Sequence, residues 1–136
     1  MKGKILISIF CFILVFSSCR KDTAPGIAGK WLNTAVYTDP AKGGIGWSSD
    51  LKFPQLLTLE QNARFYSFTD VPEGSGTYQF HRASSQLRLD YEAGQFNPAA
   101  GTLVYTVEHL DTDRMVTTIV HSDGFVLKRE YVRLKD

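Results

Sequence analysis

The stretch GTYQFHRASSQLRLDY, residues 76–91, decides the fold class of this chain. In its first half Tyr78 and Phe80 alternate with polar neighbours, and in its second half Leu87 and Leu89 do the same. A period of two is typical of β-strands with one buried face. Two serines separate the halves, so the stretch predicts an antiparallel hairpin.

Similar short runs extend outward from this hairpin in both directions. No part of the chain after residue 18 keeps an apolar period of 3.6 residues over three turns, whereas runs rich in Thr, Val, Tyr and Phe recur between turn residues. We expect eight strands, at residues 29–38, 56–61, 64–69, 76–82, 86–91, 102–110, 114–121 and 125–134. The bulky residues expected to point inward are Trp31, Tyr37, Leu57, Leu59, Tyr78, Phe80, Leu87, Leu89, Leu103 and Tyr105.

The lengths of the connections favour a barrel over a sandwich. In an up-and-down order the connections alternate between two ends. The tight ones, at residues 62–63, 83–85 and 111–113, fall at one end, and the long ones, at 39–55, 70–75 and 92–101, fall at the other. We therefore predict an all-β, eight-stranded antiparallel up-and-down barrel that is closed below and open above. Such a barrel has room for side chains or for one small ligand.

The first 18 residues have the features of a signal peptide. Lys2 and Lys4 precede an apolar run of twelve residues, which ends in small residues before Cys19. Twelve helical residues span about 18 Å, too short for a hydrocarbon core of about 30 Å. We expect residues 1–18 to be the signal peptide, 19–26 a lipidated cysteine with its tether, and 27–136 the barrel domain.

Phe16-Ser17-Ser18-Cys19 resembles a bacterial lipobox, which implies diacylglyceryl attachment to the Cys19 thiol and cleavage before it. Ordinary cleavage that leaves a free cysteine is the alternative. The other cysteine, Cys11, leaves with the signal, so no disulfide is expected in the domain. Removal of Lys2 and Lys4 also lowers the formal net charge from +1 to near −1, which does not indicate a nucleic-acid partner.

The two ends of the domain carry short motifs, Gly29-Lys30-Trp31 at the start and Tyr131-Val132-Arg133-Leu134 at the end. The first follows the Gly-x-Trp pattern that opens lipocalins, and the second resembles the closing strand of lipocalin-like domain lipoproteins of the Bacteroidetes type. The resemblance implies that Trp31 packs at the closed end under an arginine of the last strand, Arg133, or Arg129 on the same face. Physically this is a cation–π contact. The alternative is a plain core tryptophan with a solvated Arg133.

The same resemblance implies an envelope location. Lys21-Asp22 partly matches a motif that directs such lipoproteins outward, and Arg20 differs from the aspartate of inner-membrane retention. We expect anchoring to the outer membrane through Cys19, on its periplasmic or its surface face. The chain stops at Asp136, without the helix that usually follows the eighth strand of lipocalins, which indicates a smaller barrel with less cavity.

No pattern of catalytic or metal-ligating residues stands out. His81 and His109 are expected near the floor and His121 near the rim, so three histidines do not converge on a metal. Gly74-Ser75-Gly76 lacks the spacing of a nucleophile elbow and is interpreted as a flexible turn. We expect no enzyme activity, no cofactor and no metal.

The long connection at residues 39–55 is the most informative irregularity, because it joins several glycines to Trp47 and Phe53. Phe96 lies in a connection at the same end, and Tyr105 is expected on the nearby wall. These four residues are the candidate ligand-binding residues. The sequence thus predicts a lipid-anchored barrel that binds a small apolar or amphipathic ligand at its open end. The alternative is an accessory or inhibitor-type module that binds an envelope protein and has a packed interior.

Overall fold

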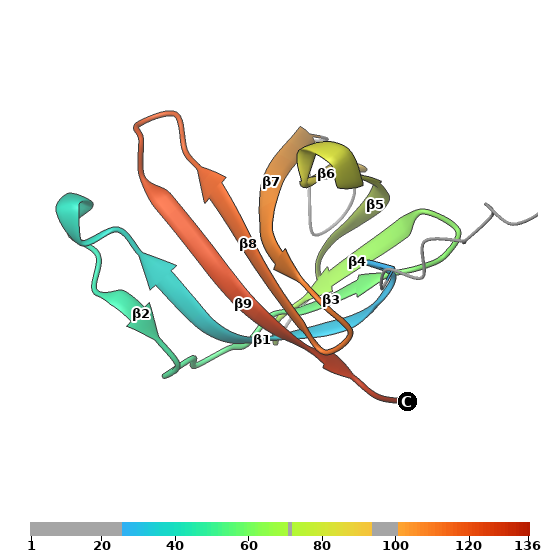
Figure 1. The fold of residues 1–136 in the computed structure, drawn as a ribbon, viewed down its shortest axis with the longest axis horizontal. Coiled ribbons are helices and arrows are strands. Elements are labelled where there is room, and N and C mark those ends of the chain that lie inside the picture. The colour runs from blue at the N-terminus through green and yellow to red at the C-terminus, as the bar shows by residue number, and fades with distance from the viewer. Residues whose placement is uncertain (1–25, 71, 94–100) are drawn as a thin grey trace, which may run out of the picture.

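The computed structural model describes residues 26–70, 72–93 and 101–136. Nine strands and two short 3₁₀ helices make up this part of the chain (Figure 1). The strands are β1 (Gly29–Thr38), β2 (Gly46–Ser48), β3 (Leu56–Leu59), β4 (Arg64–Phe68), β5 (Pro72–His81), β6 (Gln86–Tyr91), β7 (Gly101–Leu110), β8 (Arg114–Val120) and β9 (Val126–Leu134). The helices are η1 (Pro40–Lys42) and η2 (Arg82–Ser84).

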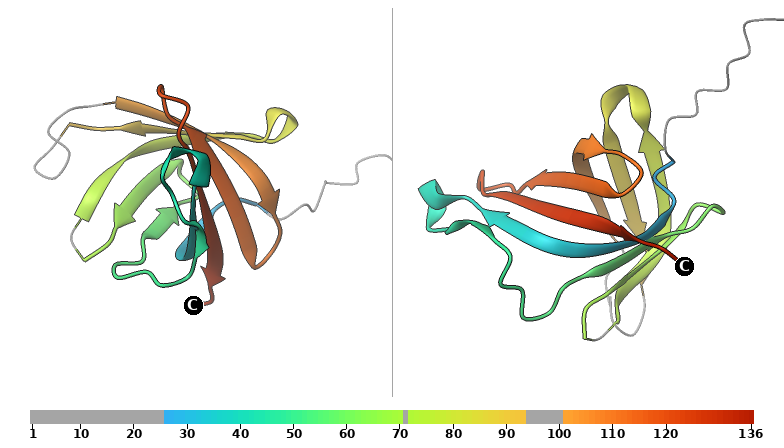
Figure 2. Two further views of the ribbon diagram at one scale, coloured as in Figure 1. Left: turned by 90° about the vertical axis from the view of Figure 1, so that its left-hand side faces the viewer. Right: turned by 60° about the horizontal axis from the view of Figure 1, so that its bottom comes forward.

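Eight of these strands form a closed antiparallel barrel, which confirms the predicted fold class. Strands β3 to β9 pair in sequence order, and β1 pairs with both β3 and β9 to close the ring. The right-hand view of Figure 2 shows β9 lying along β1 over its length. Among the described residues no helix is long and apolar enough to cross a membrane.

The ninth strand, β2, lies within the long connection between β1 and β3, which was predicted to be a loop. It pairs with the last three residues of β1, from Val36 to Thr38, whereas β3 pairs with the first four, from Gly29 to Leu32. One edge of β1 therefore pairs first with β3 and then, further along the strand, with β2. The 3₁₀ helix η1 precedes β2, and Asp39 caps it by accepting from the backbone N–H of Ala41.

A bulge in β1 changes which residues of this strand point into the barrel, contrary to the prediction. The register with β9 shifts between Asn33 and Ala35, and an extra residue in a strand reverses the alternation beyond it. Trp31 and Asn33 are buried, but Tyr37 pairs with Lys128 and Trp47 on the outer face. The prediction that Tyr37 fills the interior was wrong for this reason.

Strand β5 begins earlier than predicted. The segment Gly74-Ser75-Gly76 is extended and pairs with β4, so it is not a turn. A Cβ atom at Gly76 would lie 1.9 Å from the carbonyl oxygen of Asp90 and 2.9 Å from the Phe65 ring. Glycine is needed here because the backbones of β5 and β6 approach closely under that ring. The predicted long connection at residues 70–75 is therefore shortened to three residues.

The core fills the barrel from its floor to the level of the mouth. Its largest fully buried side chains are Trp31, Leu59, Phe65, Leu87 and Met115. The connections β3–β4, β5–β6 and β7–β8 lie at the floor end and are all tight. The connections of the other end, the mouth, include the long one that contains η1 and β2, so tight turns border the floor and a long connection borders the mouth.

Candidate binding site at the mouth of the barrel

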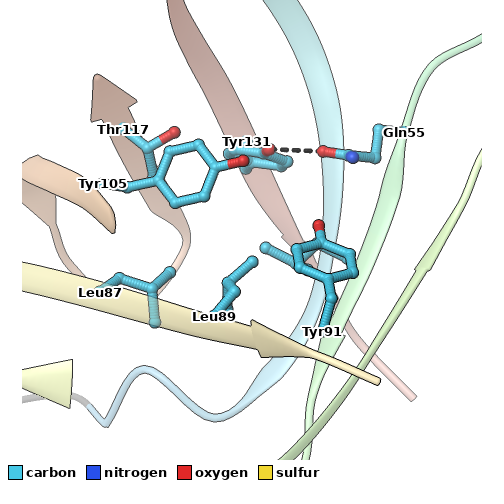
Figure 3. Close-up of a pocket in the computed structure, with 8 residues that line it drawn as sticks. Gln55, Leu87, Leu89, Tyr91, Tyr105, Thr117 and Tyr131 are labelled. Carbon is cyan, nitrogen blue, oxygen red and sulfur yellow. Dashed lines mark hydrogen bonds between the residues drawn. The ribbon is translucent and has the colours of Figure 1, made fainter. Parts of the chain in front are cut away.

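The deep interior has almost no free space. Its cavity measures about 10 Å³, the room of a single water molecule. Figure 3 shows the side chains of Tyr91, Tyr105 and Tyr131, which point toward one another above Leu87 and Leu89. Gln55, Leu57 and Thr117 complete this lining. A ligand of ordinary size therefore cannot reach the middle of the barrel unless these side chains move.

A larger, open cleft lies above this layer. It has a volume of about 410 Å³, within the range of small-molecule sites. Tyr91 and Tyr105 form its base together with Gln55, and Leu103 stands on its wall. The complete lining is Gln55, Glu73, Tyr91, Gly101, Thr102, Leu103, Tyr105 and Arg129. The cleft thus combines aromatic and aliphatic surface with one acidic and one basic side chain.

Hydrogen bonds fix the acidic side of the cleft. Nε2 of Gln55 donates to Oε2 of Glu73 at 2.7 Å and to Oγ of Ser67 at 2.9 Å, and Ser67 in turn donates to Glu73. The hydroxyl of Tyr131 donates to Oε1 of Gln55 at 2.7 Å (Figure 3). The backbone of Gln55 is also held, because its carbonyl accepts from the N–H of Asn33. Glu73 is therefore a positioned carboxylate.

The basic side of the cleft is Arg129 of β9. Its register partners are Val36 and Thr117, and Thr117 is buried, so Arg129 points to the inside of the barrel. Burial acts to lower the pKa of Arg129, but Tyr131, Tyr105 and Glu73 outweigh it and raise that pKa. The side chain is half-buried and charged at neutral pH.

The tyrosines of the site are uncharged. Burial raises the pKa of Tyr105 and of Tyr131, although Arg129 acts on both in the opposite direction. Burial also raises the pKa of Tyr91, whose ring packs edge-on against Phe65 with 4.8 Å between centroids. At neutral pH their hydroxyls remain protonated and can both donate and accept hydrogen bonds.

The floor holds a second inward arginine, Arg133. Its Cζ lies 4.2 Å from the centroid of the Trp31 ring, and its guanidinium donates to the carbonyls of Gly26, Ala28 and Thr112. The indole N–H of Trp31 donates to the carbonyl of Ile27 at 2.8 Å. The arginine over Trp31 is thus Arg133 and not Arg129. The arginine in the cleft, Arg129, lies four positions before this floor arginine on β9.

The structure does not bring the four candidate ligand-binding residues together. Tyr105 lines the cleft, but Trp47 packs on the outer face against Tyr37, with ring centroids 5.7 Å apart. Trp47 is 50% exposed and Phe53 59% exposed, and neither lines the cleft. Phe96 lies outside the described residues, as does Cys19.

The cleft residues Gln55, Glu73, Tyr91 and Arg129 were not predicted as binding residues. One signal pointed to Arg129: it alternates with outward residues along the last strand and shares a face with Tyr131 and Arg133. Glu73 had no such signal, because the glycines that follow it obscured the start of β5. In the described part of the chain no three histidine, cysteine or acidic side chains gather as a metal site.

Neither a protein-family model nor a curated protein sequence matches this chain. The fold therefore defines the class. The molecule is a closed, eight-stranded antiparallel barrel that fits a lipocalin-like binding fold, with a filled interior and a cleft at its mouth.

Proposed function

We propose that this protein is a lipid-anchored lipoprotein of the cell envelope, and that the mouth of its lipocalin-like barrel binds a small amphipathic ligand. The observation that carries the ligand proposal is the cleft of about 410 Å³, where Leu103 and Tyr91 lie beside the charged Arg129 and Glu73. A purely apolar ligand would leave these charged groups without water or partners, which is costly. An amphipathic ligand satisfies both kinds of surface.

The filled interior supports a shallow mode of binding. Because the cavity below the cleft measures about 10 Å³, the ligand lies at the mouth and is not enclosed by the barrel. Part of it then stays accessible to water or to another protein. Shallow binding of this kind favours transfer of the ligand to another molecule over its storage inside the barrel.

The position of the chain's entry into the barrel is compatible with an anchor at Cys19. Gly26 lies at the floor, where its carbonyl accepts from Arg133. Seven residues span at most about 25 Å when extended, so a lipid on Cys19 would hold the floor near the bilayer. The mouth, at the other end of the strands, would then face away from it.

A titration with 1-anilinonaphthalene-8-sulfonate, an amphipathic anion, tests the cleft. The lipidated protein in lipid nanodiscs is titrated by calorimetry, with empty nanodiscs as the blank. Leu103→Trp fills the cleft and should weaken binding about tenfold, the loss expected from a blocked apolar contact area. Val104→Trp is the matched control, because Val104 is the next residue on β7 and faces outward. Equal binding by both variants would refute the cleft as the site.

Anchoring has its own test. Cys19→Ala should abolish acylation, which intact-mass measurement of the membrane fraction detects. A variant that still carries acyl chains and fractionates with the outer membrane would contradict the lipobox interpretation.

A second candidate function, binding of an envelope protein, rests on the outer surface around β2. Ile45 is 78% exposed and adjoins the half-exposed Trp47, and such apolar groups often mark interaction sites. Among the described strands β2 pairs only with β1, so its other edge is open. A photo-crosslinking residue at position 47 tests this function, since it should give one defined adduct in cells, which Ile45→Ser should diminish.

A further inference from the structure

The mouth cleft contains two opposite charges that are not paired with each other. Arg129 and Glu73 both line it, yet the ion pairs among the described residues all involve other side chains. The two side chains therefore line the same cleft without forming an ion pair, and Glu73 also contributes to the raised pKa of Arg129. The cleft therefore presents a cation and an anion to whatever enters it.

The other arginines with assigned contacts differ from Arg129 in this respect. Arg64, Arg88 and Arg114 each contact a carboxylate on the outer surface, and Arg133 donates to three carbonyls. Arg129 is half-buried, lies in the cleft beside Tyr105, and forms no ion pair among the described residues. A guanidinium offers five N–H donors, so most of those of Arg129 remain available to a ligand.

The carboxylate of Glu73 also has hydrogen-bonding capacity left for a ligand. Its Oε2 accepts hydrogen bonds from both Gln55 and Ser67, whereas its Oε1 has no hydrogen-bond donor in the described part of the chain. Since Gln55 is itself fixed by Tyr131, the carboxylate cannot swing toward Arg129 without breaking this network. The separation of the two charges is thus built into the fold, and a positioned pair of this kind binds with little reorganisation.

We propose that the cleft binds a zwitterionic amphiphile whose carboxylate and ammonium groups are attached to the same carbon atom, as in an α-amino acid with an apolar side chain. The carboxylate contacts Arg129 and the hydroxyl of Tyr105, and the ammonium group contacts Oε1 of Glu73. The apolar chain lies along Leu103 and Tyr91. This inference rests on the proposed ligand binding at the mouth and names the chemistry of the ligand.

Three probes with eight carbon atoms each separate the possible head groups. They are 2-aminooctanoic acid, which is zwitterionic, octanoic acid, which is anionic, and octylamine, which is cationic. Calorimetry on the lipidated protein in nanodiscs, with empty nanodiscs subtracted, gives the affinity of each. We expect the zwitterion to bind about tenfold more tightly than either other probe, because it gains one further charge-assisted contact. Alanine, which has the head group without the tail, should bind weakly.

Two variants assign each charge to its contact. Arg129→Met should weaken 2-aminooctanoic acid and octanoic acid about tenfold and leave octylamine unchanged. Glu73→Gln, which keeps an oxygen to accept from Gln55 and Ser67, should weaken 2-aminooctanoic acid and octylamine and leave octanoic acid unchanged. Arg88→Met and Glu108→Gln are matched controls on the outer surface. Thermal unfolding of each variant shows whether it is folded.

The possible outcomes distinguish this inference from the proposed function. If octanoic acid or octylamine binds as tightly as the zwitterion, the zwitterionic ligand is excluded, while an amphipathic site at the mouth stands. If each variant weakens all three probes equally, the two charges do not contact the head group and the inference fails. If no probe binds the folded wild-type protein, and the sulfonate probe also fails, both proposals are wrong.

Discussion

Two arginines on one strand, Arg129 and Arg133, define the two ends of this barrel. Both point inward from β9, but Arg133 lies over the Trp31 ring and donates to three carbonyls. Arg129 lies in an open cleft, without an ion pair among the described residues. The two arginines on the inner face of β9 therefore have different roles at the two ends of the barrel. At the floor each guanidinium nitrogen of Arg133 donates to a carbonyl, whereas Arg129 lines a cleft that a ligand can enter.

This difference supports the mouth, and not the floor, as the site of the proposed ligand binding. A group whose donors are all satisfied contributes to stability and has little left for a ligand. A half-buried charge without a contacting counterion costs stability, and such a cost is typical of functional sites. If the floor is structural and the mouth functional, substitutions at the floor should lower stability more than substitutions at the mouth.

The largest effect is expected at the floor. Trp31→Ala removes a fully buried indole and its hydrogen bond to Ile27, and it should cost about 3–5 kcal/mol of unfolding free energy. Urea denaturation followed by circular dichroism measures this. Trp47→Ala is the control, because half of that side chain is exposed, and it should cost less than about 1 kcal/mol. Similar losses for both variants would contradict the floor assignment.

The next effect concerns pH. Burial raises the pKa of Tyr78, Tyr91, Tyr105 and Tyr131. The unfolded chain releases these protons near pH 10, whereas the folded chain keeps them to higher pH. Above pH 10 the unfolded state binds fewer protons, so stability is fully present below that pH and falls as the pH rises. Denaturation at several pH values, with tyrosinate absorbance, measures the decline.

Tyr105→Phe sharpens this prediction, because it removes one of the buried groups and should flatten the decline. A wild-type stability that is constant from pH 9 to pH 11.5 would show that these hydroxyls are in contact with water.

At the floor, Arg133→Met should cost about 2 kcal/mol. The variant loses the contact with Trp31 and hydrogen bonds to the carbonyls of the N-terminal segment and the β7–β8 turn. Double-mutant analysis with Trp31→Phe measures the coupling of the two side chains. Coupling energy near zero would mean that Arg133 acts through its hydrogen bonds alone.

The sequence predicted the barrel well, because it depends on alternation. Leu87, Leu89 and Tyr105 are buried as their period of two required. The sequence-based prediction was wrong where a single residue changes the inward–outward alternation of a strand or the distance between two strands. The bulge in β1 turns Tyr37 outward, and Gly76 belongs to a strand because its backbone approaches that of Asp90. Neither event has a periodic signal, since both depend on which strands become neighbours.

The candidate binding site was less predictable for a related reason. Large aromatic residues in a glycine-rich connection indicated the mouth, but Trp47 joins β1 as part of a new strand and packs on the outer face. The cleft instead takes Gln55, just before β3, Glu73, near the start of β5, and Arg129, within β9, and these residues are far apart in the sequence. The inward direction of Tyr105 was predictable from the period of two in its strand. Gln55, Glu73 and Arg129 become neighbours only when the barrel closes, so nothing in the sequence indicated that they share a site.

The smallest effect on stability is expected at Arg129, and it tests the comparison most directly. Arg129→Met replaces a half-buried cation by an apolar side chain of similar length, so it removes a desolvation cost together with the interactions with Tyr105 and Glu73. Because these contributions oppose each other, the unfolding free energy should change by less than about 0.5 kcal/mol, or rise slightly. Urea denaturation beside Arg133→Met, on the same strand and with the same substitution, provides the matched measurement. If both variants lose about 2 kcal/mol, the two arginines have one structural role, and the assignment of Arg129 to ligand binding fails.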